Sequence, residues 1–177
     1  MTAAAMMAAV LCVLAPIPVP VPGAVTSVTL ATFAVYLASA ALPVSQSLLS
    51  ILVYIFLGSL GLPVFSNYSG GLGIIVGPTG GYIAGYILCA LATGFIVGRF
   101  PNRFFIYPAA IFAGAFLCYA CGTAWFVFLT GKGLAAALSM CVVPYIPFDI
   151  VKIAAASALS FRLRRLLSVY NINSRAH

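Results

Sequence analysis

The stretch FFIYPAAIFAGAFLCYACGTAWFVFL, residues 104–129, contains no charged side chain. It exceeds the roughly 20 residues that a helix needs to cross a lipid bilayer. A helix that is apolar on every face lies either in lipid or at the centre of a large protein core. A chain of 177 residues is too short to build such a core around several helices. We therefore expect this segment to span a membrane.

The rest of the chain has the same character. Hydrophobic residues make up 64% of it and charged residues only 5%, whereas a soluble domain carries about 25% charged residues. At roughly 20 residues per span, the chain has room for about six spans. We predict an all-α, polytopic membrane protein, a compact bundle of six transmembrane helices in which residues 1–177 form a single integral membrane domain. The predicted helices cover residues 2–15, 25–42, 45–60, 79–97, 104–129 and 148–167.

Proline and glycine mark the breaks between these helices. Proline ends the first helix because it lacks an amide donor and clashes with the preceding turn. Residues 61–78 are rich in glycine and are expected to be irregular, and a short apolar piece, residues 134–143, precedes the last helix. The prolines that end the first helix are Pro16, Pro18, Pro20 and Pro22.

The basic residues predict the orientation in the membrane. The net charge of +7 comes from eight Lys and Arg against one acid, Asp149. They are not gathered into the patch that nucleic-acid binding requires, so no nucleic-acid partner is expected. Basic residues mark cytoplasmic loops, which places both termini in the cytoplasm and residues 61–78 and the start of the last helix outside. The arginines that decide this are Arg99, Arg103, Arg162, Arg164, Arg165 and Arg175.

Asp149 and Lys152 stand three residues apart at the start of the last helix, and hence on one helical face. One interpretation is structural: the two charges neutralise each other near the membrane interface. The other is a ligand site, in which Asp149 accepts hydrogen bonds from N–H groups and Lys152 meets a carboxylate. Charge-assisted bonds of this kind contribute about 1.5–3 kcal/mol each.

Two further segments on the expected outer side carry polar and aromatic residues. Residues 61–71 form a long linker, and lipid does not tolerate unpaired backbone, so the linker must be buried in protein or line a cavity. Its candidate binding residues are Asn67 and Tyr68, each of which could also belong to a solvated turn. GPTGGY opens the fourth helix and adds Thr79 and Tyr82 as candidates. It is not a phosphate-binding loop, because no lysine follows.

Small residues recur at four-residue spacing in two helices. Glycines at 77, 81 and 85 and at 94 and 98 favour close helix packing. Ala4, Ala8 and the neighbouring pair Ala5 and Ala9 give the first helix a stripe of small residues. Internal packing explains the stripe, and a docking face for another membrane subunit is the alternative.

The sequence lacks the residues that several functional classes of protein require. The sequence has no ATP-binding motif, no second acid for a proton relay and no pairing of nucleophile and base. Cys118 and Cys121 form a CxxC without a second cysteine pair, and the only histidine is His177. We expect no enzyme activity, no cofactor and no metal. Uphill transport would need energy from another protein.

Three motifs together resemble the BioY family, the biotin-binding substrate components (S-components) of energy-coupling-factor (ECF) transporters. They are GLPVFxxxxGG at residues 61–71, GPTGGY at 77–82 and PYIPFDIVK at 144–152. The proline-rich turn followed by Val28-Thr29-Leu30 matches the family as well. The resemblance covers almost the whole chain, and the motifs in this order are specific to the family.

The resemblance implies a six-helix bundle with an outer-face pocket that holds biotin. Asp149 and Lys152 would bind the ureido ring and the valerate carboxylate, with either assignment open, and Asn67 would add a ureido contact. The alanine stripe would dock on a transmembrane coupling subunit that works with two cytoplasmic ATP-binding subunits. The protein would lie in the bacterial cell membrane.

The chain departs from the family pattern at two places. The family commonly has Gln where this chain has Ala31, so one polar contact or packing bond is lost. Residues 66–69 read Ser-Asn-Tyr-Ser where small residues are more usual. The alternatives to a biotin component of an ECF transporter are a component for a different vitamin, a biotin facilitator that works alone, and a membrane-embedded enzyme or structural protein.

Overall fold

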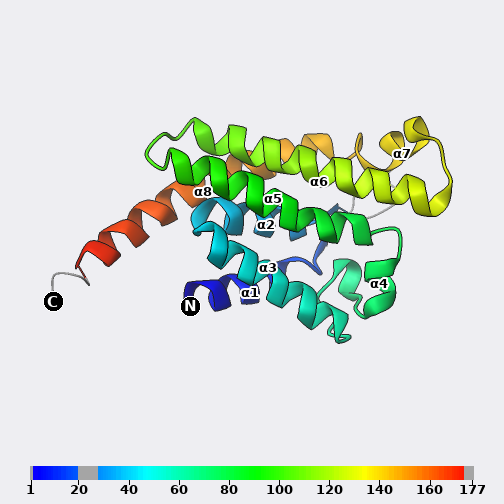
Figure 1. Cartoon of the computed structure of the whole chain (residues 1–177), viewed down its shortest axis with the longest axis horizontal. Coiled ribbons are helices and arrows are strands. Elements are labelled where there is room, and N and C mark those ends of the chain that lie inside the picture. Colours follow the sequence, from blue (N-terminus) through cyan, green and yellow to red (C-terminus); the bar gives the residue numbers. More distant parts are fainter. Residues whose placement is uncertain (1, 20–27, 174–177) are drawn as a thin grey trace.

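The structure, a computed structural model, describes residues 2–19 and 28–173. Helices lie side by side along most of its length, and α1 begins at the end of the bundle where α8 leaves it (Figure 1). The elements in chain order are α1 (Thr2–Leu14), β1 (Pro18–Val19), β2 (Val28–Thr29), α2 (Ala31–Ala41), α3 (Val44–Ser59), the 3-10 helix η1 (Ser66–Tyr68), α4 (Leu72–Val76), α5 (Gly80–Arg99), α6 (Ile106–Thr130), α7 (Leu134–Cys141) and α8 (Ile146–Asn173).

Each predicted helix has a counterpart, with differences at the ends. The second begins at Ala31 rather than at residue 25, because Val28 and Thr29 pair with β1 in a small antiparallel sheet. The first residues of that prediction, like Arg175, lie outside the described part of the chain. The linker of residues 61–78 is not wholly irregular, since it contains η1 and α4. The last helix starts two residues early, and it accommodates Pro147 in its first turn, where no amide donor is needed.

The helices differ in their capacity to cross a bilayer unaided. Within the described ranges, α5 and α6 are long and apolar enough, with 20 and 25 residues, and α7 with α8 forms a third, bent candidate with an angle of 55°. Helices α1, α2 and α3 are apolar but have only 13, 11 and 16 residues. The predicted number of six spans is therefore approximate. Large exposed side chains such as Phe95 and Phe112 cover the outside of the long helices, as expected for a surface in contact with lipid.

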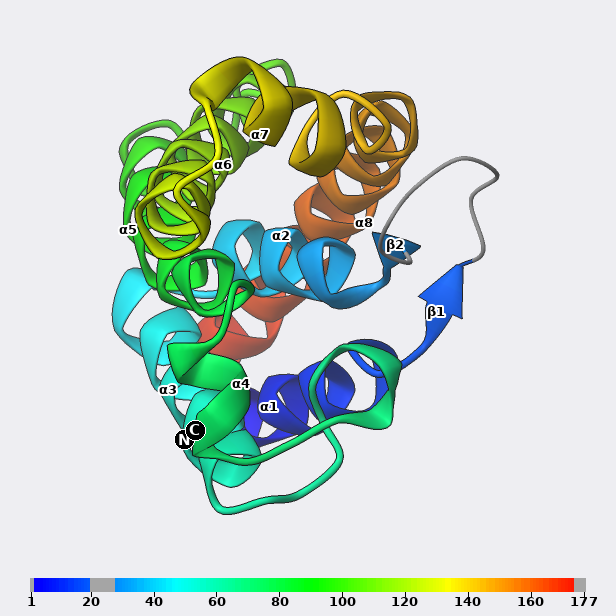
Figure 2. The same ribbon diagram turned by 90° about the vertical axis from the view of Figure 1, so that its right-hand side faces the viewer.

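Helix α2 occupies the centre of the bundle (Figure 2). It packs against α8 on one side and α5 on another, while α1 and α3 pack below it in that view. Ala34, Val35 and Ala38 are fully buried in α2. These small side chains let the neighbouring helices approach one short helix closely.

Glycines bring α5 and α6 together, as their spacing predicts. A side chain at Gly81 would overlap Trp125, and one at Gly85 would lie 2.9 Å from the Cys118 carbonyl oxygen. Gly94 packs instead against Val44 of α3. At Gly98 the prediction is wrong, because that position faces open space at the end of α5.

The alanines of α1 divide between two faces. Ala4 and Ala8 are buried against α3, and the Ser50 hydroxyl of α3 donates to the Ala4 carbonyl at 2.9 Å. These two alanines serve internal packing, so they cannot form a docking face in this arrangement. Ala5 and Ala9 are exposed, on a face about 100° around the helix from Ala4 and Ala8.

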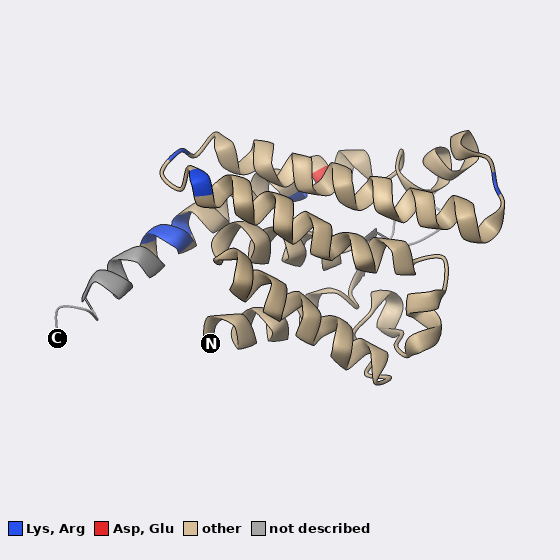
Figure 3. Ribbon diagram, viewed as in Figure 1, with Lys and Arg blue, Asp and Glu red and all other residues tan. Residues whose placement is uncertain are grey.

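Charge is distributed unevenly along the bundle (Figure 3). The basic segments of the α5–α6 connection and of α8 gather at the end where α1 begins. In the described part of the chain, the opposite end carries one basic segment, in the α6–α7 connection. That connection is residues 131–133 and contains Lys132. The single acid lies inside the bundle.

Candidate ligand-binding site

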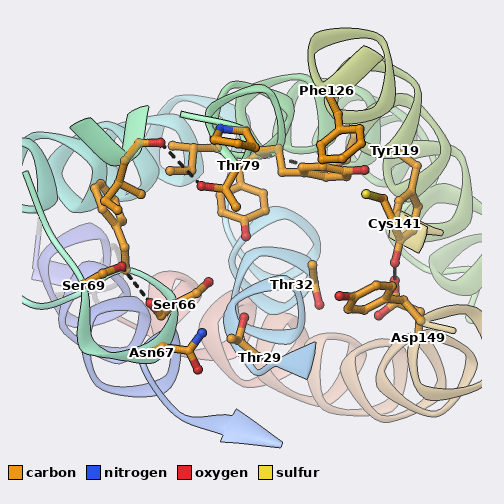
Figure 4. A pocket seen from close by; sticks show the side chains of 18 of the residues that line it. Thr29, Thr32, Ser66, Asn67, Ser69, Thr79, Tyr119, Phe126, Cys141 and Asp149 are labelled. Atoms are coloured by element: carbon orange, nitrogen blue, oxygen red, sulfur yellow. Dashed lines mark hydrogen bonds between the residues drawn. The ribbon is translucent and has the colours of Figure 1, made fainter. Parts of the chain in front are cut away.

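A cavity of about 440 Å³ opens between the helices and the segment that contains η1 and α4. This volume falls within the usual range of small-molecule sites, about 300–1,000 Å³. Asn67 and Ser66 lie on one side of the open space and Asp149 on the other, with Thr32 between them (Figure 4). The polar and aromatic residues that line the cavity are Thr29, Thr32, Tyr36, Tyr54, Phe65, Ser66, Asn67, Ser69, Thr79, Tyr82, Tyr86, Tyr119, Phe126, Lys132, Tyr145, Asp149 and Lys152.

Asp149 and Lys152 form an ion pair in the wall of this cavity. The Lys152 Nζ lies 3.4 Å from the Asp149 Oδ1, and both side chains are nearly buried, with 10% and 6% of their surfaces exposed. A charge at such a position is costly without a countercharge. The pairing across three residues of α8 follows from the helical repeat, and it supplies that countercharge.

Asp149 accepts two further hydrogen bonds from tyrosines of other helices. The Tyr36 hydroxyl of α2 donates to Asp149 Oδ2 at 3.0 Å, and the Tyr119 hydroxyl of α6 donates to the same oxygen at 2.6 Å. The carboxylate therefore joins α2, α6 and α8. Among the described residues its Oδ1 has only Lys152 as a partner, so this oxygen keeps capacity to accept from a ligand.

Lys152 joins α8 to the start of α2. Its ammonium donates to the Thr29 carbonyl oxygen at 2.8 Å and to the Thr32 hydroxyl at 3.0 Å. An ammonium has three donors, and Asp149 takes the third direction. The ion pair is thus held in place by threonines on one side and by tyrosines on the other.

Aromatic rings form much of the remaining wall. Tyr82 and Tyr119 meet edge to face, with ring centroids 6.3 Å apart. The Tyr82 hydroxyl pairs with the Thr123 hydroxyl at 3.3 Å. Such rings offer apolar surface for a ligand body while their hydroxyl groups keep polar partners.

The segment around η1 covers the cavity and is anchored from below. The fully buried Phe65 ring packs edge to face on Tyr54 at 5.5 Å and fills the space left by Gly58. The Phe65 amide donates to the Ser69 carbonyl at 2.9 Å, which closes a tight loop. Asn67 lies at the tip of that loop with a positive φ of 58°, a conformation that asparagine adopts more readily than most residues.

Five of the six candidate ligand residues line the cavity: Asn67, Thr79, Tyr82, Asp149 and Lys152. Tyr68 is not among the lining residues, and its side chain is 63% exposed. The ligand contacts themselves remain predictions.

Sequence reasoning missed several residues of the cavity. Tyr36, Tyr119 and Thr32 hold the ion pair, and Lys132 lies at the mouth. A signal was present for the tyrosines: a hydroxyl in the middle of an apolar helix needs a partner, and the chain has one carboxylate side chain to offer. Across residues 2–19 and 28–173, no three His, Cys, Asp or Glu side chains lie close enough to hold a metal ion.

Comparisons with known proteins identify the family of this chain. A model of the BioY family matches residues 1–169. The biotin transporter BioY of Thermotoga maritima is 36% identical over 78% of this chain and 80% of its own length. The biotin transporter BioY2 of Lactococcus lactis subsp. cremoris is 31% identical over 97% of this chain and 93% of its own length.

A solved structure shares the fold. It is the crystal structure of the S-component for biotin from an ECF-type ABC transporter. The match has a TM-score of 0.84 at 23% sequence identity and covers 93% of this chain and 89% of that chain. The helical arrangement of the two proteins is therefore the same over nearly their whole lengths.

Proposed function

The chain belongs to the BioY family, and from that premise we propose that it captures biotin at the outer face of the cell membrane for import. It acts as the substrate-binding component of an ECF-type transporter. Relatives that align over most of their length are named as biotin transporters, and the fold is that of an S-component for biotin. These names support a role as a component of a transporter rather than as an enzyme.

The observation that carries the proposal is the nearly buried Asp149–Lys152 pair inside a covered, aromatic-lined cavity. Biotin has an apolar bicyclic body, a urea at one end and a carboxylate at the other. Asp149 Oδ1 is available to accept from the urea N–H groups, and the tyrosine rings suit the bicyclic body. Asn67, in the cover across the cavity, adds a second polar contact to the urea. Thr79 and Tyr82 complete the wall beside it.

The protein is a multi-pass membrane protein, and we place both termini in the cytoplasm. The described arginines collect at the end of the bundle where α1 begins, as the preference of basic residues for the cytoplasmic side requires. The cavity mouth with Lys132 then faces outward. Residues 1–177 act as one membrane domain in this scheme.

Energy for import comes from other subunits, because the sequence carries no ATP-binding motif. These are a transmembrane coupling subunit and two cytoplasmic ATP-binding subunits. The exposed face of α1, with Ala5 and Ala9, is the docking surface that we assign to the coupling subunit. Small residues on that face allow another helix to approach closely.

Equilibrium binding of labelled biotin to the purified chain in detergent tests the proposal. We expect saturable binding at one site, competition by desthiobiotin, which keeps the urea ring, and none by thiamine. A component for another vitamin would bind the matching vitamin and not biotin. Absence of saturable biotin binding would overturn the proposal.

A further inference from the structure

The cavity holds more positive charge than the Asp149–Lys152 pair suggests. Three charged side chains line it among the described residues: Asp149, Lys152 and Lys132. One carboxylate and two ammonium groups leave the cavity with one net positive charge. A ligand with one negative charge would make the occupied cavity neutral.

Lys152 is poorly placed to bind an anion. Its three donor directions point to Asp149 Oδ1, the Thr29 carbonyl and the Thr32 hydroxyl. A carboxylate that approached Lys152 would displace one of these partners, and it would also approach the Asp149 carboxylate. Like charges in a nearly buried site repel strongly. The pair is therefore suited to a neutral polar group, such as a urea.

Lys132 has the opposite surroundings. It lies in the connection after α6, where Gly131 adopts a positive φ of 65° and turns the chain toward α7. The side chain is exposed, and its Nζ donates to the Met140 sulfur at 3.8 Å. A thioether sulfur is a weak acceptor. The sequence has a single acidic residue, Asp149, which is paired elsewhere. No acidic side chain of this chain is left to neutralise Lys132.

Its position in the molecule is also distinctive. The described arginines gather at the other end of the bundle, and the α6–α7 connection bears the one basic segment at the mouth end (Figure 3). A cation on that side runs against the usual membrane preference. A role in the cavity that it lines accounts for its presence there.

We propose that Lys132 binds the carboxylate of the ligand at the mouth of the cavity, while the Asp149–Lys152 pair binds the neutral urea ring. This inference rests on the proposed function, and it assigns an orientation to bound biotin: the ring lies at the Asp149–Lys152 pair and the valerate tail points toward the α6–α7 connection. It assigns the carboxylate to Lys132 instead of Lys152. Charge-assisted bonds from an ammonium to a carboxylate supply the affinity.

A thermodynamic cycle that combines one substitution with one change of ligand tests the inference. The two ligands are biotin and its neutral methyl ester. Wild type and Lys132→Gln are titrated with both. We expect Lys132→Gln to weaken biotin binding about tenfold or more, and to bind the ester as wild type does, within about twofold. Wild type should then bind the ester more weakly than biotin, whereas Lys132→Gln should bind the two ligands with almost equal affinity. Lys132→Arg, which keeps the positive charge, should retain most of the affinity for biotin.

The controls separate the possible failures. Arg99→Gln removes a cation at the other end of the bundle and should leave the affinity for both ligands unchanged. If Lys132→Gln binds biotin normally, or weakens biotin and ester alike, the assignment is overturned while the proposed function stands. If wild type binds neither ligand, the assignment and the proposed function are both overturned. Thermal unfolding of each variant in detergent shows whether the exposed substitution has left the fold intact.

Discussion

Two walls of the cavity, the α5–α6 wall and the α2–α8 wall, are held together by different forces. Between α5 and α6 the closest contacts are steric: Gly85 admits the Cys118 backbone, and Gly114 admits the Thr93 hydroxyl and the Cys89 carbonyl. A side chain at either glycine would overlap atoms of the facing helix or lie within about 3 Å of them. The hydrogen bonds between these helices join neutral groups, as between the Tyr82 and Thr123 hydroxyls and from the Thr93 hydroxyl to the Ala110 carbonyl.

Between α8 and the segment formed by β2 and α2, charged groups take part in the hydrogen bonds. Tyr36 donates to Asp149, and Lys152 donates to Thr29 and Thr32. Further along, the Ser160 hydroxyl of α8 donates to the Leu37 carbonyl at 3.5 Å. Two of the three charged groups that line the cavity, Asp149 and Lys152, are on this side, because both belong to α8.

Because the two walls are held together differently, we expect them to contribute differently to stability and to ligand recognition. The steric wall can lose packing without changing what the cavity binds, whereas a change in the polar wall alters both the fold and the ligand contacts. Substitutions in the two walls should therefore show different ratios of lost stability to lost affinity. The following experiments are ordered by the size of the expected effect.

Asp149→Asn should have the largest effect, because it leaves the ammonium of Lys152 nearly buried without a countercharge. We expect the free energy of unfolding to fall by about 3–5 kcal/mol and biotin affinity to fall at least about tenfold. Reversible unfolding in mixed micelles and a biotin titration measure the two losses.

The matched control is the double variant Asp149→Asn with Lys152→Met. Since no charge is then buried, most of the stability should return, while biotin binding should stay weak. Normal biotin affinity in the single variant would remove Asp149 from the ligand site.

Gly114→Leu tests the steric wall. The new side chain would overlap Thr93 and crowd the Cys89 carbonyl, so we expect a loss of about 1–3 kcal/mol in the free energy of unfolding. Gly114 does not line the cavity, and the folded fraction should bind biotin with normal affinity. Gly98→Leu, at a glycine that faces open space, is the size-matched control and should change neither quantity. A large loss of affinity in folded Gly114→Leu would show that the walls are not separable.

Tyr119→Phe removes one donor from Asp149 and leaves the Tyr36 donor in place. A hydrogen bond to a charged group contributes about 1.5–3 kcal/mol, so stability should fall by about 1.5 kcal/mol. Biotin affinity should fall less than in Asp149→Asn. Tyr68→Phe removes a hydroxyl from an exposed side chain outside the cavity lining and should be silent. Equal effects of the two substitutions would contradict the proposed role of the Tyr119–Asp149 bond.

Substitutions in α1 should have the smallest effect on binding. Ala5→Trp enlarges the exposed face of α1, so biotin binding should be normal while biotin uptake by cells that contain the complete transporter is lost. Ala8→Trp instead places a large ring in the buried contact with α3 and should destabilise the protein. Normal uptake by Ala5→Trp would exclude this face as the docking surface.

The sequence predicted the parts of the fold that depend on local pattern. Long apolar runs and proline breaks located the helices, and glycine spacing anticipated the close contact at Gly85. The three-residue spacing of Asp149 and Lys152 was enough to predict that they share a face. These features need only the helical repeat and backbone sterics.

Other features depend on which helices become neighbours, which no local pattern states. Tyr36 and Tyr119 donate to Asp149 from positions 113 and 30 residues away in the sequence. The direction of the alanine stripe was equally open, and the structure turns Ala4 and Ala8 inward. Lys132 was not singled out from the sequence, and only the fold shows that it lines the cavity.

The position of bound biotin in an experimental structure of the purified chain tests the central claim most directly. The ureido ring should lie within hydrogen-bonding distance of Asp149 Oδ1, beneath the loop that carries Asn67, with the carboxylate toward Lys132. Biotin bound outside this cavity, or with its ring remote from Asp149, would contradict the claim that a nearly buried acid–base pair recognises the ligand.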